Sequence, residues 1–255
     1  MTVAMSAEYI LETRDLTKDF SGFTAVSEVN LKVRKGSIHA LIGPNGAGKT
    51  TVFNLLTKFL IPSSGSILFK GKDITREKPA DVALRGIIRS FQISAVFPKL
   101  SPFENVRIAL QRRLGTCYHF WKPVSSLDIL TERAFELLDS VGLKELAHHH
   151  TEELAYGQKR ALEIATTLAL DPELMLLDEP TQGMGAEDVG KITELVRKVA
   201  QNRTILMVEH NLKVVASLAD RITVLQRGSI LAEGEYDEVS RNPQVMEAYM
   251  GSVHA

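Results

Sequence analysis

The chain has 255 residues, of which 44% are hydrophobic and 24% charged, and its formal net charge is -1 at pH 7. This composition is typical of a globular protein with a real core, and the balanced charge gives no indication of nucleic-acid binding. The single cysteine, Cys117, excludes an internal disulfide, and no apolar run is long enough to span a bilayer. The first residues lack the features of a signal peptide. We therefore expect a cytosolic protein that reaches a membrane only through a partner.

The first third of the chain has the pattern of short strands. Alternating or continuous apolar runs predict strands within residues 9–20, 24–33, 36–43 and 65–74. A helical pattern, residues 50–59, lies between the last two of these. The middle section, residues 93–157, differs because it has helical periodicity, loop-like interruptions and little strand pattern. We interpret it as a helical insertion between sheet strands.

Two later apolar runs, residues 174–178 and 204–210, are nearly continuous. Strands that are buried on both faces of a parallel sheet have this composition. Helical patterns follow them at residues 187–200 and 213–218, and a final hairpin is predicted around Arg227-Gly228. The alternation of strands and helices predicts an α/β fold with a partly parallel sheet.

The sequence GPNGAGKT, residues 43–50, matches the P-loop pattern G-x-x-x-x-G-K-[ST] in full. It follows an apolar strand and precedes a helix, as a phosphate-binding loop requires. Glycine residues allow successive backbone N–H groups to turn toward a phosphate without a Cβ clash. Lys49 would supply a cation to the β- and γ-phosphates, and the Thr50 hydroxyl would ligate Mg²⁺. The loop residues before them are Gly43, Pro44, Asn45, Gly46, Ala47 and Gly48.

Two adjacent carboxylates follow the first buried run. Asp178 is a natural second anchor for Mg²⁺, because a parallel strand presents its carboxyl end beside the P-loop. Glu179 would polarise the attacking water as a general base. The alternative for Glu179 is a solvated acidic loop before Pro180.

Two further residues lie where the same sheet edge is expected. His210 ends the second buried run and would hydrogen-bond a γ-phosphate, although a lone histidine is more often a structural hydrogen-bonding residue. Gln92 lies where the sheet gives way to the helical insertion, a position that suits a hinge in contact with Mg²⁺ or water.

The stretch LAYGQKRALEIA, residues 154–165, predicts a second site for an anion. Its apolar positions fall on one face of a helix, and a helix N-terminus offers backbone N–H groups and the positive end of a dipole. Just before it, His148, His149 and His150 form a run of histidines. Because consecutive side chains point in different directions, we expect a solvated loop here, with a metal site as the alternative.

These motifs, in this order, resemble those of the nucleotide-binding subunits of ABC transporters. The correspondences are residues 43–50 with Walker A, Gln92 with the Q-loop, residues 154–158 with the signature, residues 174–179 with Walker B and His210 with the H-loop. The resemblance covers nearly the whole chain. It implies a P-loop NTPase cassette with a mixed, largely parallel core sheet, an antiparallel β subdomain and an inserted α-helical subdomain. Residues 1–92 and 158–240 would form the nucleotide-binding core, 93–157 the helical subdomain and 241–255 a short tail.

The resemblance also implies a mechanism: two cassettes pair head to tail, bind ATP and Mg²⁺, and hydrolyse ATP. The signature of one cassette, Leu154, Ala155, Tyr156, Gly157 and Gln158, would contact ATP held by the other. Phe20 would stack on adenine, with a core phenylalanine as the alternative, and Val26 and Thr51 would also contact ATP. The signature departs from the family pattern at Ala155 and Tyr156, which resembles a subfamily form. Gly185 replaces the usual D-loop aspartate, which puts that contact across the dimer in doubt.

The resemblance finally implies partners and a biological role. The partners would be a second, identical or similar ATPase subunit, integral membrane permease subunits and, indirectly, a substrate-binding protein, with the chain held peripherally on the inner face of the cell membrane. An apolar stretch after Gln92 would receive a short helix of the permease; it contains Ile93, Ala95, Val96, Phe97, Leu100 and Phe103. Uptake of branched-chain amino acids or related amides is the expected role. The alternatives are the ATPase of a lipopolysaccharide-type exporter and a soluble ABC ATPase without a transport role.

Overall fold

The computed structural model describes residues 8–90, 96–112 and 123–250. The chain forms two compact units. Unit 1 consists of Met1–Ile87, Glu173–Glu179 and Val199–Ala255, and unit 2 of Ile88–Pro172 and Pro180–Lys198. In the described part of the chain, every helix is too short or too polar to pass through a lipid bilayer.

The first sheet of unit 1 is antiparallel. Its strand order is β2 (Phe23–Val29), β1 (Tyr9–Phe20), β5 (Ser64–Phe69) and β6 (Lys72–Asp73), and β3 (Lys32–Arg34) also pairs with β1. Side chains alternate between the two faces of a strand, and so Ile67 and Phe69 of β5 are buried. This sheet is the predicted antiparallel β subdomain.

The second sheet is mostly parallel. Its order is β11 (Ser229–Gly234), β10 (Arg221–Gln226), β4 (Ile38–Ile42), β9 (Thr204–Val208), β8 (Leu174–Asp178) and, at the edge, β7 (Ile87–Ser90), where the chain leaves unit 1. Strands β10, β4, β9 and β8 are parallel, whereas β11 is antiparallel to β10. All residues of β4, β8 and β9 are buried, as their continuous apolar sequences predict. The carboxyl ends of these three strands therefore meet at one edge of the sheet.

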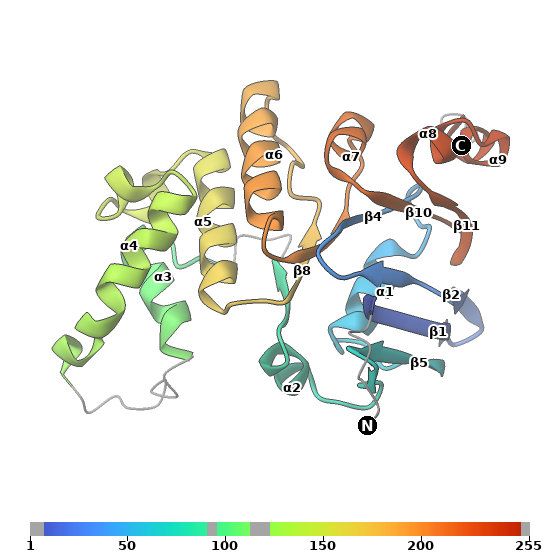
Figure 1. Ribbon diagram of the computed structural model, residues 1–255, viewed down its shortest axis with the longest axis horizontal. Helices are drawn as coiled ribbons and strands as arrows, with labels where there is room; N and C mark the ends of the chain where they lie inside the picture. The colour runs from blue at the N-terminus through green and yellow to red at the C-terminus, as the bar shows by residue number, and fades with distance from the viewer. Residues whose placement is uncertain (1–7, 91–95, 113–122, 251–255) are drawn as a thin grey trace. The chain divides into compact units, whose positions relative to one another are not determined.

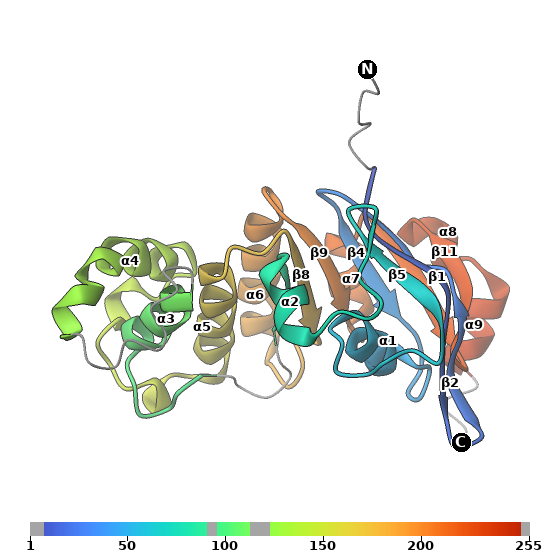
Figure 2. The ribbon, with the colours of Figure 1, turned by 90° about the horizontal axis from the view of Figure 1, so that it is seen from below.

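Helix α1 (Lys49–Leu56) follows β4 and joins the core of unit 1. One hydrophobic cluster contains Phe53 of α1, Leu11 and Ile67 of the first sheet, and Leu41 of the second. Figure 2 shows α1 beside β4. The helix is shorter than the predicted 50–59 because Lys58 takes a left-handed backbone conformation (φ 64°), which ends it. The remaining helices of unit 1 are α2 (Pro79–Leu84), α7 (Leu212–Leu218), α8 (Tyr236–Ser240) and α9 (Pro243–Met250).

Unit 2 is built around a set of packed helices. They are α3 (Pro102–Gln111), α4 (Thr131–Ser140), α5 (Tyr156–Ala169) and α6 (Ala186–Ala200), of which residues up to Lys198 belong to this unit. Helices α3, α4 and α5 pack against one another. Figures 1 and 2 both show α5 between α6 and the α3–α4 pair. This unit contains the predicted helical insertion.

Candidate functional site

The loop between β4 and α1, residues 43–48, has the backbone shape of a phosphate cradle. Gly43 has φ 149° and Gly48 has φ 101°, both in the region that favours glycine. A Cβ atom on Gly43 would lie 2.2 Å from the carbonyl oxygen of Leu225, and one on Gly48 would lie 2.6 Å from that of Ala25. Glycine is therefore required at both positions, for conformation and for close approach of the backbone.

Lys49 is the first residue of α1 and is buried, with 6% of its surface exposed. Its Nζ donates to the carbonyl oxygens of Gly43 (2.7 Å) and Pro44 (2.9 Å). Burial lowers the pKa of Lys49, while the carboxylates of Glu179 and Asp178 act in the opposite direction by favouring the charged form. The ammonium group thus lies within electrostatic reach of both carboxylates that the sequence analysis singled out.

The next residues along α1 differ in accessibility. Thr50 is exposed and Thr51 is half-buried. Because Thr50 occupies the first turn of α1, its hydroxyl is available beside the P-loop.

Asp178 and Glu179 lie at the carboxyl end of β8. Asp178 is 2% exposed and pairs in register with Val208 of β9. Glu179 has a left-handed backbone (φ 48°), and its N–H donates to the Val208 carbonyl oxygen at 2.9 Å. A left-handed glutamate costs about 1–2 kcal/mol, and such strain is concentrated at functional sites. Glu179 is 9% exposed, and so the alternative of a solvated acidic loop is wrong.

His210 lies beside Glu179, at the end of the neighbouring strand. Its Nε2 is 2.7 Å from Glu179 Oε1, and its side chain is 41% exposed. The backbone N–H groups of His210 (2.6 Å) and Asn211 (3.1 Å) donate to one carboxylate oxygen of Glu209. Glu209, which is 3% exposed, holds the turn that carries His210. We did not predict this role from the sequence, although an acidic residue between a buried strand and a histidine is the pattern that would have revealed it.

Phe20 lies at the end of β1, opposite Phe23 across a tight turn. It is 42% exposed, and so the alternative of a core phenylalanine is wrong. The Nζ of Lys18 lies 5.1 Å from the centroid of its ring. Val26, by contrast, is fully buried beneath the junction of the P-loop and α1, where its Cγ2 would lie 3.6 Å from a Cβ on Gly48.

The predicted second anion site is the N-terminus of α5 in unit 2. Leu154 is buried just before the helix, and Ala155 occupies the N-cap position, where it has no side-chain oxygen to accept a backbone N–H. Gln158 Oε1 accepts from the Ala155 N–H at 2.9 Å. A Cβ on Gly157 would lie 2.9 Å from Cγ of Asp188 in the first turn of α6. A larger residue at position 157 would therefore force the Asp188 side chain to move, a contact that the sequence pattern did not reveal.

Tyr156, the first residue of α5, is 47% exposed. The guanidinium carbon of Arg160 lies 6.0 Å from its ring centroid. Arg160 also pairs with Glu163 at 2.7 Å, and both side chains are buried. Lys159, which precedes Arg160 on the helix, donates through its Nζ to the carbonyl oxygen of Glu152 at 3.0 Å.

Several predicted residues lie elsewhere. Gln92, Ile93, Ala95 and Cys117 fall outside the described residues. Of the apolar stretch, Phe97 is 53% exposed, whereas Phe103 is buried and contacts Phe135 with ring centroids 5.1 Å apart. The run His148, His149 and His150 is exposed in a loop, as predicted. Among the described residues, no group of three or more His, Cys, Asp or Glu side chains is arranged to hold a metal ion.

The P-loop, its lysine and helix α1 lie at one edge of the sheet, together with strand-end carboxylates and a histidine. This arrangement defines a P-loop nucleotide-binding protein. Residues 26–182 match the family described as "ABC transporter", and residues 229–255 match one described as "Branched-chain amino acid ATP-binding cassette transporter". The chain belongs to the ABC transporter family and is an ATP hydrolase of that family. The resemblance and the fold class predicted from the sequence are confirmed.

The chain is similar to curated proteins along almost its whole length. It is 39% identical to the high-affinity branched-chain amino acid transport ATP-binding protein BraF of Pseudomonas aeruginosa, over 95% of this chain and 98% of that protein. The identity to LivG of Escherichia coli, which has the same description, is 37% with the same coverage.

Solved structures share the fold. The ADP conformation of MJ1267, an ATP-binding cassette of an ABC transporter, has a TM-score of 0.85 and 32% identity, and the similarity covers 95% of this chain and 99% of that one. A dimeric structure of MJ0796, a bacterial ABC transporter cassette, has a TM-score of 0.74 and 25% identity over 89% of this chain and 98% of that one.

Proposed function

We propose that this chain binds and hydrolyses ATP to power uptake of branched-chain amino acids or related amides through an ABC transporter. The site geometry supports the hydrolytic part: Glu179 and His210 lie 2.7 Å apart at the sheet edge that also carries Lys49. The transport role is supported by the similarity to BraF and LivG over 95% of this chain and by the match of residues 229–255. Neither alternative, export of lipopolysaccharide or a role outside transport, has comparable support.

Mg²⁺ and ATP fit the residues of unit 1. Thr50 and Asp178 offer the oxygen ligands that Mg²⁺ prefers, at the exposed start of α1 and at the end of β8. Gln92 is proposed as a third ligand. When bound, Mg²⁺ neutralises charge on the phosphate oxygens. Lys49 and the backbone of residues 43–48 hold the phosphates, and Thr51 lies beside them.

The adenine end of the nucleotide is proposed to lie at the other sheet. Phe20 offers an exposed π-face at the end of β1, and stacking requires only a flat ring. Val26 shapes this part of the site from below, since it is buried.

Glu179 is the proposed general base. One oxygen of its carboxylate accepts a hydrogen bond from His210, and the carboxylate would accept the proton of an attacking water. The water oxygen then bonds to the γ-phosphorus as the bond to the β-phosphate oxygen breaks, and ADP and phosphate are formed. His210 orients the carboxylate and adds a hydrogen-bond donor near the transferred phosphoryl group.

A second cassette completes the site. The N-terminus of α5, residues 154–158, supplies backbone N–H groups and the positive end of a helix dipole to the γ-phosphate that another cassette holds. The absence of a polar side chain at Ala155 leaves this role to the backbone. The dimeric structure of MJ0796 supports pairing in this family.

The remaining partners follow from this role. The pair of cassettes, identical or similar, would bind integral permease subunits on the inner face of the cell membrane, and Phe97 is exposed in the segment proposed to contact them. A substrate-binding protein would act on the other side of the membrane.

Reconstitution tests this function. The chain is co-expressed with branched-chain amino acid permease subunits from its own organism, and the complex is placed in liposomes with the substrate-binding protein outside and ATP inside. We expect accumulation of radiolabelled leucine, isoleucine or valine that is lost with Glu179→Gln. ATP-dependent export, or uptake that does not respond to Glu179→Gln, would contradict the proposal.

A further inference from the structure

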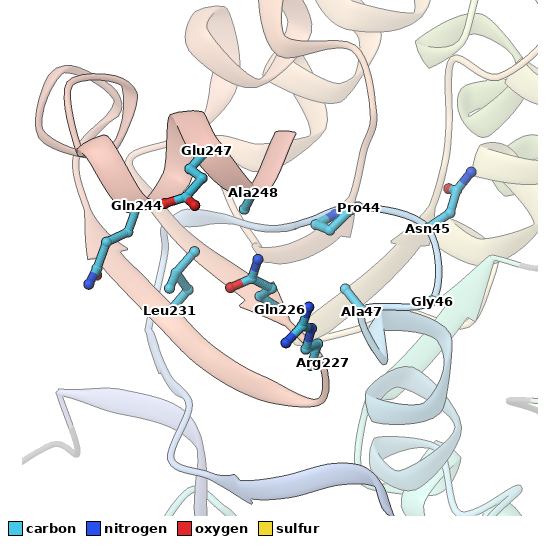
Figure 3. Close-up of a pocket in the computed structure, with 10 residues that line it drawn as sticks. All are labelled: Pro44, Asn45, Gly46, Ala47, Gln226, Arg227, Leu231, Gln244, Glu247 and Ala248. Carbon is cyan, nitrogen blue, oxygen red and sulfur yellow. The ribbon is translucent and has the colours of Figure 1, made fainter. Parts of the chain in front are cut away.

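Two pockets border the two halves of the proposed nucleotide site, one in each unit. In unit 1, a pocket of about 570 Å³ lies between the P-loop, the β10–β11 turn and α9. Figure 3 shows Arg227 beside Ala47 of the P-loop, and Glu247 of α9 across this pocket. In unit 2, a pocket of about 480 Å³ lies between the start of α5, the first part of α6 and the turn after α4. Each pocket carries charged side chains next to one half of the proposed site.

Arg227 is an exposed cation next to the P-loop. It lies in the β10–β11 turn with a left-handed backbone (φ 49°), and the N–H of the next residue, Gly228, donates to the Ala47 carbonyl oxygen at 3.0 Å. This hydrogen bond holds the turn against the phosphate cradle. Within the part of the chain that the structure describes, no ion pair joins Arg227 to a carboxylate, including that of Glu247 in the same pocket.

Asp188 is an anion next to the start of α5. It is half-buried in the first turn of α6, and its Oδ1 and Oδ2 atoms would lie 3.1 Å and 3.2 Å from a Cβ on Gly157. Lys191, one turn further along α6, already pairs with Glu187 at 2.7 Å. Among the described residues, none forms a hydrogen bond or an ion pair with the Asp188 carboxylate. A full negative charge without an ion-pair partner therefore lies beside the α5 half of the site.

These two charges have opposite signs and border the two surfaces that the proposed function brings together. In a head-to-tail pair, the P-loop of one cassette meets the α5 start of the other, and the same contact occurs twice by symmetry. Arg227 of each copy then lies on the side of the other copy's Asp188. Opposite charges at facing positions of an interface steer association and fix the register of the two partners. A second copy thus supplies the ion-pair partner that each charge lacks in a single chain.

We propose that Arg227 of one cassette pairs with Asp188 of a second copy of this chain, at the edge of the shared nucleotide site. The pair stabilises the dimer and fixes its register without touching the nucleotide. This inference rests on the proposed function, which supplies the head-to-tail arrangement.

Charge reversal tests the pair in chains that also carry Glu179→Gln, with sedimentation at saturating MgATP as the measurement. We expect Arg227→Glu and Asp188→Arg, each alone, to raise the dissociation constant of the dimer by about tenfold or more, because each places like charges opposite one another. An equal mixture of these two variants is expected to form dimers within about threefold of the unreversed affinity. The reason is that each mixed dimer contains one original and one reversed pair, both of opposite sign.

A second reversal in the same chain provides the matched control. Arg227→Glu combined with Asp188→Arg is expected to recover the dimer, whereas Arg227→Glu combined with Glu136→Arg has the same net charge and is expected to stay weak. Glu136 is exposed on α4, where it pairs with Arg133. Because Asp188→Arg adds bulk, Asp188→Asn is measured as well, and we expect about a three- to fivefold weaker dimer. High salt is expected to reduce this difference by screening the pair.

The outcomes separate this pair from the function on which it rests. A dimer dissociation constant within twofold of the unreversed chain in Arg227→Glu or Asp188→Asn would overturn the pair. A mixture that stays as weak as its components, or an equal recovery with Glu136→Arg, would also overturn it. Chains with Glu179→Gln alone that bind MgATP and stay monomeric would instead overturn the head-to-tail site of the proposed function.

Discussion

The starts of α1 and α5 are two helix N-termini suited to an anion, and they differ in what accompanies the backbone. At α1, a glycine-bearing loop precedes a buried lysine, and the carboxylates of Asp178 and Glu179 lie within its electrostatic reach. At α5, an alanine caps the helix, and the nearby Arg160 is already paired with Glu163. In the proposed function, the first holds a triphosphate by itself, whereas the second adds N–H groups to a phosphate that is held elsewhere. This difference explains why one chain carries both.

The largest loss of ATP turnover is expected when the cation at the start of α1 is removed. Lys49→Met leaves a neutral side chain of similar length, and we expect ATP turnover to fall by about 10²–10³-fold, since it removes a charged donor to the phosphates. Lys70→Ala is the control, because Lys70 forms an exposed pair with Glu173 away from the P-loop motif. Equal turnover in the two variants, measured as phosphate release, would mean that α1 does not carry the principal phosphate site.

His210 is the next most sensitive group at the α1 edge. His210→Ala removes the hydrogen bond to Glu179, and we expect kcat to fall by about 10²-fold because the base loses its orientation. His210→Gln keeps a side-chain donor and is expected to recover part of the loss. A kcat that stays at the wild-type level in His210→Ala would show that Glu179 needs no partner.

His39, on strand β4 next to α1, is expected to make the free energy of unfolding depend on pH. His39 on β4 is fully buried, and its Nε2 lies 2.8 Å from Thr223 Oγ1. Burial lowers the pKa of His39 from 6.5 to about 4. Between these values the unfolded chain binds a proton that the folded chain does not, and so stability falls as the pH drops from 7 toward 4.

At pH 5 this loss amounts to about 2 kcal/mol, or thirtyfold in the folding equilibrium. Urea unfolding at pH 7.5 and pH 5 measures it, with His39→Gln as the variant that lacks the titrating group. A wild-type chain that loses no more stability than His39→Gln would contradict the assignment.

The start of α5 is expected to give the smallest effect and a different signature. Gly157→Ala places a methyl group against Asp188, and we expect turnover to fall by about tenfold while the affinity of a single chain for nucleotide is unchanged. Asp188→Ala in the same chain removes the clash and is expected to restore part of the turnover. A loss of nucleotide affinity in Gly157→Ala as large as its loss of turnover would mean that the start of α5 contacts the nucleotide held by its own chain.

The local patterns predicted most of the fold and the α1 half of the site. Residues 43–50, Asp178 and His210 belong to short motifs whose flanking strands are continuous apolar runs, and such runs fix where a strand ends. The contacts that were missed join residues far apart in the chain or depend on turn geometry. Asp188 meets Gly157 only after folding, while Glu209 acts through the turn before α7. The sequence around these residues gives no indication of which residues they contact.

The shared site is tested most directly by the oligomeric state of Glu179→Gln, measured by sedimentation with and without saturating MgATP. The account predicts a monomer without nucleotide and a stable dimer with MgATP, because each P-loop holds a triphosphate that the α5 start of the other cassette encloses and that is no longer hydrolysed. Adding Lys49→Met is expected to abolish the dimer. A Glu179→Gln chain that binds MgATP and remains monomeric would contradict the account.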